Sequence, residues 1–141
     1  MTPRSPAPSG RRGIASDAPC PCGSGERFDG CCGPLLDGAP APRPEALMRS
    51  RYTAFALGDA PHLRESWHPG TRPDTIDLDA ATRWIRLEIL DVEGGGRDDR
   101  RGTVEFRAWY RDPGRPETSL HERSRFVRQS GRWWYLDGAV R

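Results

Sequence analysis

The 141-residue sequence contains no lysine and no asparagine, and its single glutamine is Gln129. All 22 basic residues are therefore arginine. A bias of this kind is typical of a genome with a high GC content. The absence of lysine also excludes two chemistries, namely Schiff-base catalysis and the phosphate-binding lysine of a P-loop.

Long apolar runs are absent as well, and no stretch approaches the about 20 apolar residues that a membrane-spanning helix needs. Arg11 and Arg12 are not followed by an apolar region, so we expect no secretory signal. The net charge is only +2, because 22 basic residues are mixed with 20 acidic ones. A nucleic-acid-binding surface usually shows a stronger basic bias. We therefore expect a cytoplasmic protein without a membrane or direct nucleic-acid partner.

The chain divides by composition into three parts. Residues 1–18 are rich in proline, serine, glycine and arginine and hold too little apolar surface to offset the entropy of ordering, so we expect a disordered tail. Residues 19–36 contain all the cysteines, and the proline-rich segment 37–44 follows as a short linker. Residues 40–141 are expected to form the main domain.

Helical periodicity marks the first part of this domain. Apolar side chains recur on one face between Pro44, which suits a first helical turn, and Gly58, which suits a helix end. A second helix is expected to begin after the N-cap residue Asp59, to turn Trp67 toward the core and to stop before Pro69.

From residue 83 onward the apolar pattern changes to a period of two, which is typical of strands. Helices followed by consecutive strands predict an α+β fold. In this fold the helices pack on a curved antiparallel four-stranded sheet and leave a pocket between. The four predicted strands are residues 83–93, 103–111, 119–129 and 132–138.

The serine–glycine pair at 130–131 predicts a tight turn between the last two strands. With this turn, Phe126 pairs with Tyr135 and Ser124 pairs with Asp137. The register places aromatic rings and carboxylates on one sheet face, as in the lining of a pocket. Together with the facing helices, it gives the candidate pocket residues Arg51, Tyr52, Trp67, His68, Glu122, Ser124, Phe126, Tyr135 and Asp137.

Two interpretations of the pocket carboxylates remain open. Glu122 and Asp137 would lie close together, so one of them could have a raised pKa and act as an acid or base. Alternatively, Arg49 or Arg51 neutralises the two carboxylates in a buried ion pair that holds the helix to the sheet. The sequence alone contains no complete catalytic constellation.

Histidine supplies the other candidate acid–base groups, because imidazole titrates near neutral pH. His68 lies between Trp67 and Pro69, where a structural hydrogen bond is the alternative to a catalytic role. His121 alternates out of phase with Glu122, so we expect only Glu122 to face the pocket.

All four cysteines lie in the segment CPCGSGERFDGCC, residues 20–32. Four thiolates are the full ligand set of a structural zinc site, and a metal could supply the folding energy of a segment too short to build a core. The spacings are tighter than in common zinc sites, and Cys31 and Cys32 can share a metal only in a turn or at a helix start. Structural zinc, a thiol redox role and disulfides all remain open.

The segment CPCGSGERFDGCCG resembles the SEC-C motif, a small zinc module found at the C-terminus of the SecA translocation ATPase and in other proteins. The resemblance implies that the motif binds Zn²⁺ and contacts a protein or ribosomal partner, as it does in SecA. The ligands that it implies are Cys20, Cys22, Cys31 and Cys32.

The segments ALMRSRYTAF, LHERSRFVR and GRWWYLDG extend the resemblance to the YchJ family of bacterial proteins. That family joins an N-terminal SEC-C motif to a domain of the nuclear-transport-factor-2-like (NTF2-like) fold. The fold is a cone of helices on a curved sheet with an internal pocket, as the pattern of helices and strands also predicts. The family carries no biochemical activity that could be transferred to this chain.

Three functions from different classes follow as hypotheses. The first, which we favour, is a binding protein whose SEC-C module docks a protein or ribosomal partner and whose second domain holds a ligand or partner segment. The second is a small-molecule enzyme of isomerase, dehydratase or hydrolase type that uses the pocket carboxylates. The third is a protein that senses metal or redox state through its cysteines.

Overall fold

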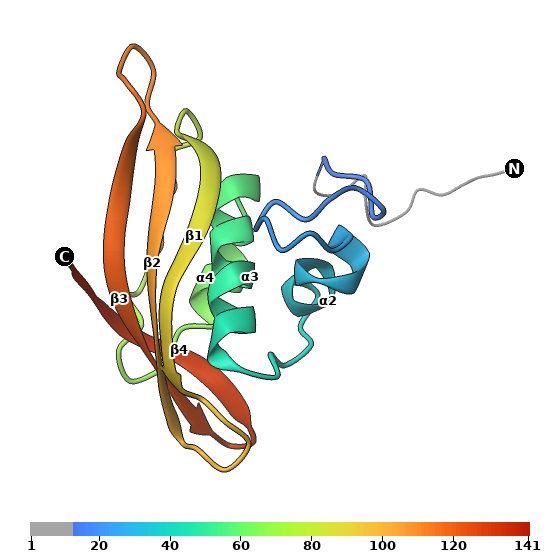
Figure 1. The fold of residues 1–141 in the computed structure, drawn as a ribbon, viewed down its shortest axis with the longest axis vertical. Coiled ribbons are helices and arrows are strands. Elements are labelled where there is room, and N and C mark those ends of the chain that lie inside the picture. The colour runs from blue at the N-terminus through green and yellow to red at the C-terminus, as the bar shows by residue number, and fades with distance from the viewer. Residues whose placement is uncertain (1–12) are drawn as a thin grey trace, which may run out of the picture.

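The computed structural model describes residues 13–141, in which helices cover one face of a curved four-stranded sheet (Figure 1). The α+β architecture predicted from the sequence is confirmed. No helix among the described residues is long and apolar enough to cross a membrane. The helical elements are η1 (Phe28–Gly30), α2 (Cys32–Leu36), α3 (Pro44–Leu57) and α4 (Ala60–Glu65).

The four strands form one antiparallel sheet in sequence order, so every neighbouring pair is joined by a hairpin connection. Their bounds agree with the predicted strands to within two residues at each end. The strands are β1 (Arg83–Gly94), β2 (Arg101–Arg111), β3 (Thr118–Gln129) and β4 (Arg132–Val140).

Local signals determine both ends of α3 and the start of α4. Pro44 occupies the first turn of α3, and Gly58 ends the helix with a φ of 76°, a conformation that favours glycine. The side chain of Asp59 then caps α4 by accepting a hydrogen bond from the backbone N–H of His62 at 3.1 Å. Helix α4 ends before Trp67, which forms an isolated parallel bridge with β4 instead.

The hairpin between β3 and β4 departs from the predicted register. Pairing follows the prediction as far as Phe126 and Tyr135, and a bulge then shifts it by one residue. Asp137 consequently pairs with Arg125, so the predicted pairing of Asp137 with Ser124 is wrong. Because side chains alternate between the faces of a strand, this shift moves Asp137 to the opposite face of the sheet.

The cysteine-containing segment packs on the side of α3 that faces away from the sheet, so the molecule has three layers (Figure 1). Its buried residues Phe28 and Leu36 belong to the same core cluster as Leu47 of α3 and Phe106 of β2. The segment therefore shares the core of the main domain and is not a separately packed module.

Residues 13–18, which belong to the predicted disordered tail, are ordered against the cysteine segment. Residues 13–18 extend the cysteine segment: Phe28 donates a backbone hydrogen bond to the carbonyl of Ala18 at 2.8 Å, and Asp29 donates one to Ser16 at 2.9 Å. Ile14 packs against the core cluster. Backbone pairing with the cysteine loop thus orders a sequence whose composition favours disorder. Residues 1–12 lie outside the described residues.

Candidate metal centre and ligand cavity

The sulfur atoms of the four cysteines lie within 4.8 Å of one another. Cys22 Sγ is 3.6 Å from Cys31 Sγ, which in turn is 4.0 Å from Cys32 Sγ. In a tetrahedral site with metal–sulfur bonds of about 2.3 Å, neighbouring sulfurs are about 3.8 Å apart. The donor set therefore fits a tetrahedral metal ion bound by sulfur alone.

Local backbone geometry brings the two cysteine pairs together. The loop between the pairs contains Gly23 and Gly25, whose φ angles of 78° and 89° favour glycine. Cys20 donates a backbone hydrogen bond to the carbonyl of Glu26 at 2.9 Å, which closes this loop. The second pair lies at the start of α2, the arrangement that adjacent cysteines need in order to share a metal.

Helix α3 supplies further contacts to the cluster. Thr53 Oγ1 donates a hydrogen bond to Cys32 Sγ at 3.3 Å. Arg49 Nη1 donates to the carbonyl oxygen of Cys22 at 3.0 Å and lies 3.9 Å from its sulfur, while Nε donates to Glu45 at 2.9 Å. Four thiolates around a divalent ion leave a net negative charge, which the guanidinium and the hydroxyl offset.

Without a cation, the four thiols compete for ionisation. Hydrogen bonds from Cys20 and Cys32 hold the pKa of Cys22 far below its usual range, and hydrogen bonding to Cys20 and Cys22 raises that of Cys32. Burial raises the pKa of Cys31 to about 11, although Ser24 Oγ, 3.1 Å from its sulfur, lowers it. A divalent ion would remove this competition by binding all four residues as thiolates.

All four cysteines are free thiols, so the disulfide alternative does not describe this structure. Cys20, Cys22 and Cys32 are at most 4% exposed, and only Cys31 is partly accessible. Reactive thiols are generally accessible to their oxidant or substrate. The burial thus favours a metal-binding role over thiol redox chemistry.

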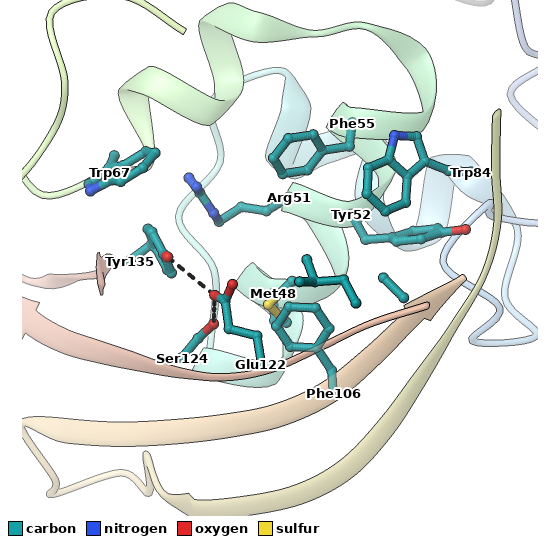
Figure 2. Close-up of a pocket in the computed structure, with 12 residues that line it drawn as sticks. Met48, Arg51, Tyr52, Phe55, Trp67, Trp84, Phe106, Glu122, Ser124 and Tyr135 are labelled. Atoms are coloured by element: carbon teal, nitrogen blue, oxygen red, sulfur yellow. Dashed lines mark hydrogen bonds between the residues drawn. The ribbon is translucent and has the colours of Figure 1, made fainter. Parts of the chain in front are cut away.

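A cavity of about 260 Å³ lies on the other side of α3, between this helix and the inner face of the sheet (Figure 2). Its lining is largely aromatic and aliphatic, with polar groups gathered at one end. The lining residues are Met48, Arg51, Tyr52, Phe55, Trp67, Trp84, Phe106, Ala108, Leu120, Glu122, Ser124 and Tyr135.

Arg51 provides a buried positive charge at the polar end. The residue is only 3% exposed, and its Nη1 donates to the carbonyl of Leu63 and to Ser66 Oγ, both at 2.7 Å. Its guanidinium carbon lies 4.1 Å from the ring centre of Tyr135 and 5.1 Å from that of Trp67. Burial lowers the pKa of Arg51 to about 10, so the side chain is still charged at neutral pH.

Glu122 provides the opposite charge on the floor of the cavity (Figure 2). Its Oε2 accepts hydrogen bonds from Ser124 Oγ at 2.8 Å and Tyr135 Oη at 3.3 Å. Burial, followed by the charge of Glu122, raises the pKa of Tyr135 to about 12, so the phenol keeps the proton that it donates. Gly138 leaves room for this carboxylate, because any Cβ there would collide with Oε2.

The structure brings six of the nine predicted pocket residues to the cavity, and three lie elsewhere. Phe126 is fully buried in the core, with its ring centre 5.8 Å from that of Tyr135. His68 follows α4 in a loop, where Nδ1 accepts from the N–H of Gly70 and Nε2 donates to Gln129 Oε1 at 2.7 Å. His68 therefore has the structural hydrogen-bonding role.

The predicted carboxylate pair of Glu122 and Asp137 is wrong. The bulge in β4 places Asp137 on the face of the sheet away from the cavity, where Arg125 Nε donates to Oδ1 at 2.7 Å. Hydrogen bonding to Arg125 lowers the pKa of Asp137. The predicted neutralisation by Arg49 is wrong, because Arg49 contacts Glu45 and the cysteine segment instead. Arg51 does line the cavity with Glu122, and the charge of Glu122 raises the pKa of Arg51 against the larger lowering by burial.

Sequence reasoning placed His121 correctly and missed several other positions. His121 faces away from the cavity and its Nε2 lies 2.7 Å from Glu105 Oε2, as the strand alternation predicts. The buried His62, which was not considered, has Nε2 2.9 Å from Ser50 Oγ and ties α4 to α3. The contact of Thr53 with the cysteines was also missed, since nothing in a linear motif indicates which helix face meets a distant loop.

A sequence model of the YchJ middle NTF2-like domain matches residues 43–138. The chain belongs to the YchJ-like family. The match covers the helices α3 and α4 and most of the sheet, and therefore the whole lining of the cavity. It confirms the family and the NTF2-like fold that the sequence resemblance implied.

Relatives match a longer part of the chain than the domain model does. A UPF0225 protein of Streptomyces coelicolor is 54% identical over 121 residues, which is 85% of this chain and 94% of that protein. A UPF0225 protein of Deinococcus radiodurans is 47% identical over 122 residues, or 86% and 88% of the two chains. The solution structure of a SEC-C motif containing protein from Rhodopseudomonas palustris is 43% identical, with a TM-score of 0.75 over 86% of this chain and 98% of that one.

Proposed function

We propose that this member of the YchJ-like family is a zinc-stabilised binding protein whose cavity holds one small ligand. The observation that carries the proposal is the cavity itself, in which six aromatic side chains surround a space with a buried arginine and a carboxylate at one end. Binding sites commonly combine such an apolar lining with a few convergent polar groups that orient the ligand. A cavity required only for folding would not need two charges.

The proposed ion is Zn²⁺, held by Cys20, Cys22, Cys31 and Cys32. Zinc prefers a tetrahedral set of thiolates, and a set of four protein ligands leaves no open position for a substrate. When bound, the ion supplies folding energy to the cysteine segment rather than catalysis. Such a cluster needs reduced thiols, which supports a cytoplasmic location.

Helix α3 connects the proposed metal centre to the cavity. Arg49 and Thr53 point to the cysteines, whereas Met48, Arg51 and Tyr52 line the cavity. A bound ion would therefore hold the outer side of the same helix whose inner side forms the ligand-binding wall. We propose that the zinc module acts as a structural support for this wall.

The enzyme hypothesis loses its main support, because it depended on Glu122 and Asp137 sharing one pocket. The burial of three cysteines likewise favours a structural metal over a redox sensor. The docking of a protein or ribosomal partner by the SEC-C module stays a prediction.

The proposal is tested by titrating the zinc-loaded protein with toluene, an apolar probe of the cavity, while NMR resonances of Trp84 and Phe106 are followed. We expect saturable shifts of these resonances. Ala108→Leu fills the cavity and should abolish them, whereas Ala139→Leu, an exposed alanine on β4, should not. The proposal fails if the wild-type resonances do not respond, or if Ala108→Leu binds toluene as the wild type does.

A further inference from the structure

We infer that the cavity selects an uncharged aromatic molecule whose polar edge carries a hydrogen-bond acceptor beside a donor, as an amide does. The acceptor faces Arg51 and the donor faces Glu122. This inference rests on the proposed function and specifies the chemical class of its ligand. It follows from hydrogen-bonding capacity that the protein itself leaves unused at the polar end of the cavity.

Arg51 has unused donors. A guanidinium carries five N–H groups, and the two on Nη1 are taken by Leu63 and Ser66. Within residues 13–141, no hydrogen-bond acceptor pairs with the N–H groups of Nε and Nη2, and the guanidinium forms no ion pair with a carboxylate. Because the side chain is 3% exposed, these donors cannot reach bulk water freely. An acceptor atom on a ligand would satisfy them.

Glu122 has an unused acceptor. Both hydrogen bonds that the carboxylate receives, from Ser124 and Tyr135, end on Oε2. Among the described residues, none donates to Oε1. Figure 2 shows the carboxylate projecting from β3 into the cavity, on the side where the guanidinium of Arg51 lies. A donor on the same ligand would complete the site.

The two opposite charges determine which polar group fits. A ligand anion would be attracted by Arg51 but repelled by Glu122, whereas a cation would be attracted by Glu122 but repelled by Arg51. A neutral group with an acceptor and a donor side by side meets both residues favourably. It also loses less hydration on entering an apolar cavity than a charged group does.

The remaining walls define the body of the ligand as flat and aromatic. Trp84 from β1 packs its ring 5.5 Å from that of Phe55 and 6.1 Å from that of Tyr52, so one side of the cavity is a continuous aromatic surface. Phe106 and Met48 also line this space. Aromatic surfaces favour offset-stacked or edge-to-face contacts with a second ring.

The test compares four probes that share one ring and differ only in the attached group: benzamide, benzoate, benzylamine and toluene. Each is titrated into the full-length, zinc-loaded protein and followed by NMR. We expect benzamide to bind roughly tenfold more tightly than each of the other three, because only benzamide satisfies both polar residues. Binding of benzoate or benzylamine as tight as that of benzamide would overturn the inference.

Glu122→Gln supplies the decisive variant. The glutamine keeps the size of the side chain but removes the negative charge, so the preference should move from benzamide toward benzoate. Glu105→Gln changes a carboxylate of the same sheet on the face away from the cavity and should keep the wild-type preference. Bound zinc and a dispersed NMR spectrum show that each variant is folded.

The outcomes separate the inference from the proposed function. If toluene binds and Glu122→Gln leaves the order of the probes unchanged, the cavity is a binding site but its charges do not select the ligand, and the inference is wrong. If none of the four probes binds the wild-type cavity, the proposed function fails together with the inference. If Glu122→Gln shifts the preference toward benzoate and Glu105→Gln does not, the result supports both the proposed function and the inference.

Discussion

The cysteine cluster and the cavity lie on opposite sides of α3 and are built in different ways. All ligands of the cluster come from residues 20–32, and local turns bring them together. The cavity lining extends from Met48 to Tyr135 and combines α3 and Trp67, which follows α4, with all four strands. The cluster therefore depends on the geometry of one loop, whereas the cavity depends on the register of a whole sheet.

This difference predicts how each region responds to substitution. A substitution in the cysteine loop should weaken metal binding directly, and should weaken ligand binding in the cavity only through its effect on α3. A change in the sheet register or at the polar end of the cavity should act on ligand binding and leave the metal in place.

The double substitution Cys22→Ser/Cys32→Ser should abolish zinc binding and unfold the cysteine segment. Structural zinc contributes about 10 kcal/mol or more to small zinc modules, so no other contact in the segment can replace it. Hydrogen exchange should show loss of protection over residues 13–43 while the sheet amides stay protected. Benzamide binding should weaken, because α3 loses its outer support; unchanged affinity would show that α3 does not connect the two sites.

Three glycine-to-alanine substitutions compare the regions directly. Gly33→Ala places a Cβ 2.8 Å from the carbonyl oxygen of Phe28 and should destabilise the cysteine segment and weaken zinc binding. Gly138→Ala collides with the carboxylate of Glu122 and should weaken benzamide binding with zinc retained. Gly30→Ala meets nothing within 4 Å and is the control.

For each of the three glycine variants, we would measure the thermal stability, the zinc affinity and the benzamide affinity. Steric conflict in a packed region costs about 1–3 kcal/mol. If Gly33→Ala and Gly138→Ala impair the same one of the two sites, the separation between cluster and cavity is wrong.

Thr53→Val should weaken zinc binding without affecting the fold. The substitution keeps the shape of the side chain but removes the hydroxyl that donates to Cys32 Sγ. Loss of such an outer contact lowers metal affinity about 10- to 100-fold. Competition with a chelator measures the change, and Thr71→Val, in an exposed loop, serves as the control. Equal affinity in the two variants would contradict the role of α3 at the metal centre.

Asp137→Asn should have the smallest effect. Its ion pair with Arg125 is solvent-exposed, and such pairs contribute less than about 1 kcal/mol. Benzamide binding should be unchanged, because Asp137 lies on the face of the sheet away from the cavity. If Asp137→Asn weakens benzamide binding as much as Glu122→Gln does, Asp137 acts at the cavity together with Glu122, as the sequence predicted.

The sequence predicts the fold well because its signals are local. Pro44, Gly58 and Asp59 mark helix ends through their own backbone chemistry, and the period-two pattern marks each strand. The cysteine cluster is equally local, and its one geometric requirement, a helix start at Cys32, is met.

The cavity is predicted only in part. Asp137 is misplaced because the alternation of Trp133, Tyr135 and Asp137 gives no sign of the bulge that separates the last residue from the first two. His68 is misplaced because α4 ends early and the following loop takes its own path. The polar end of the cavity could not be predicted, since the unused donors of Arg51 become visible only when every neighbour is in place.

The most direct test of the account is X-ray absorption at the zinc edge on protein purified under reducing conditions without added metal. A four-cysteine zinc site should give one zinc ion per folded chain, surrounded by four sulfur atoms at about 2.3 Å. A natively folded chain without metal, or a zinc ion with nitrogen or oxygen in place of any of the four sulfurs, would contradict it.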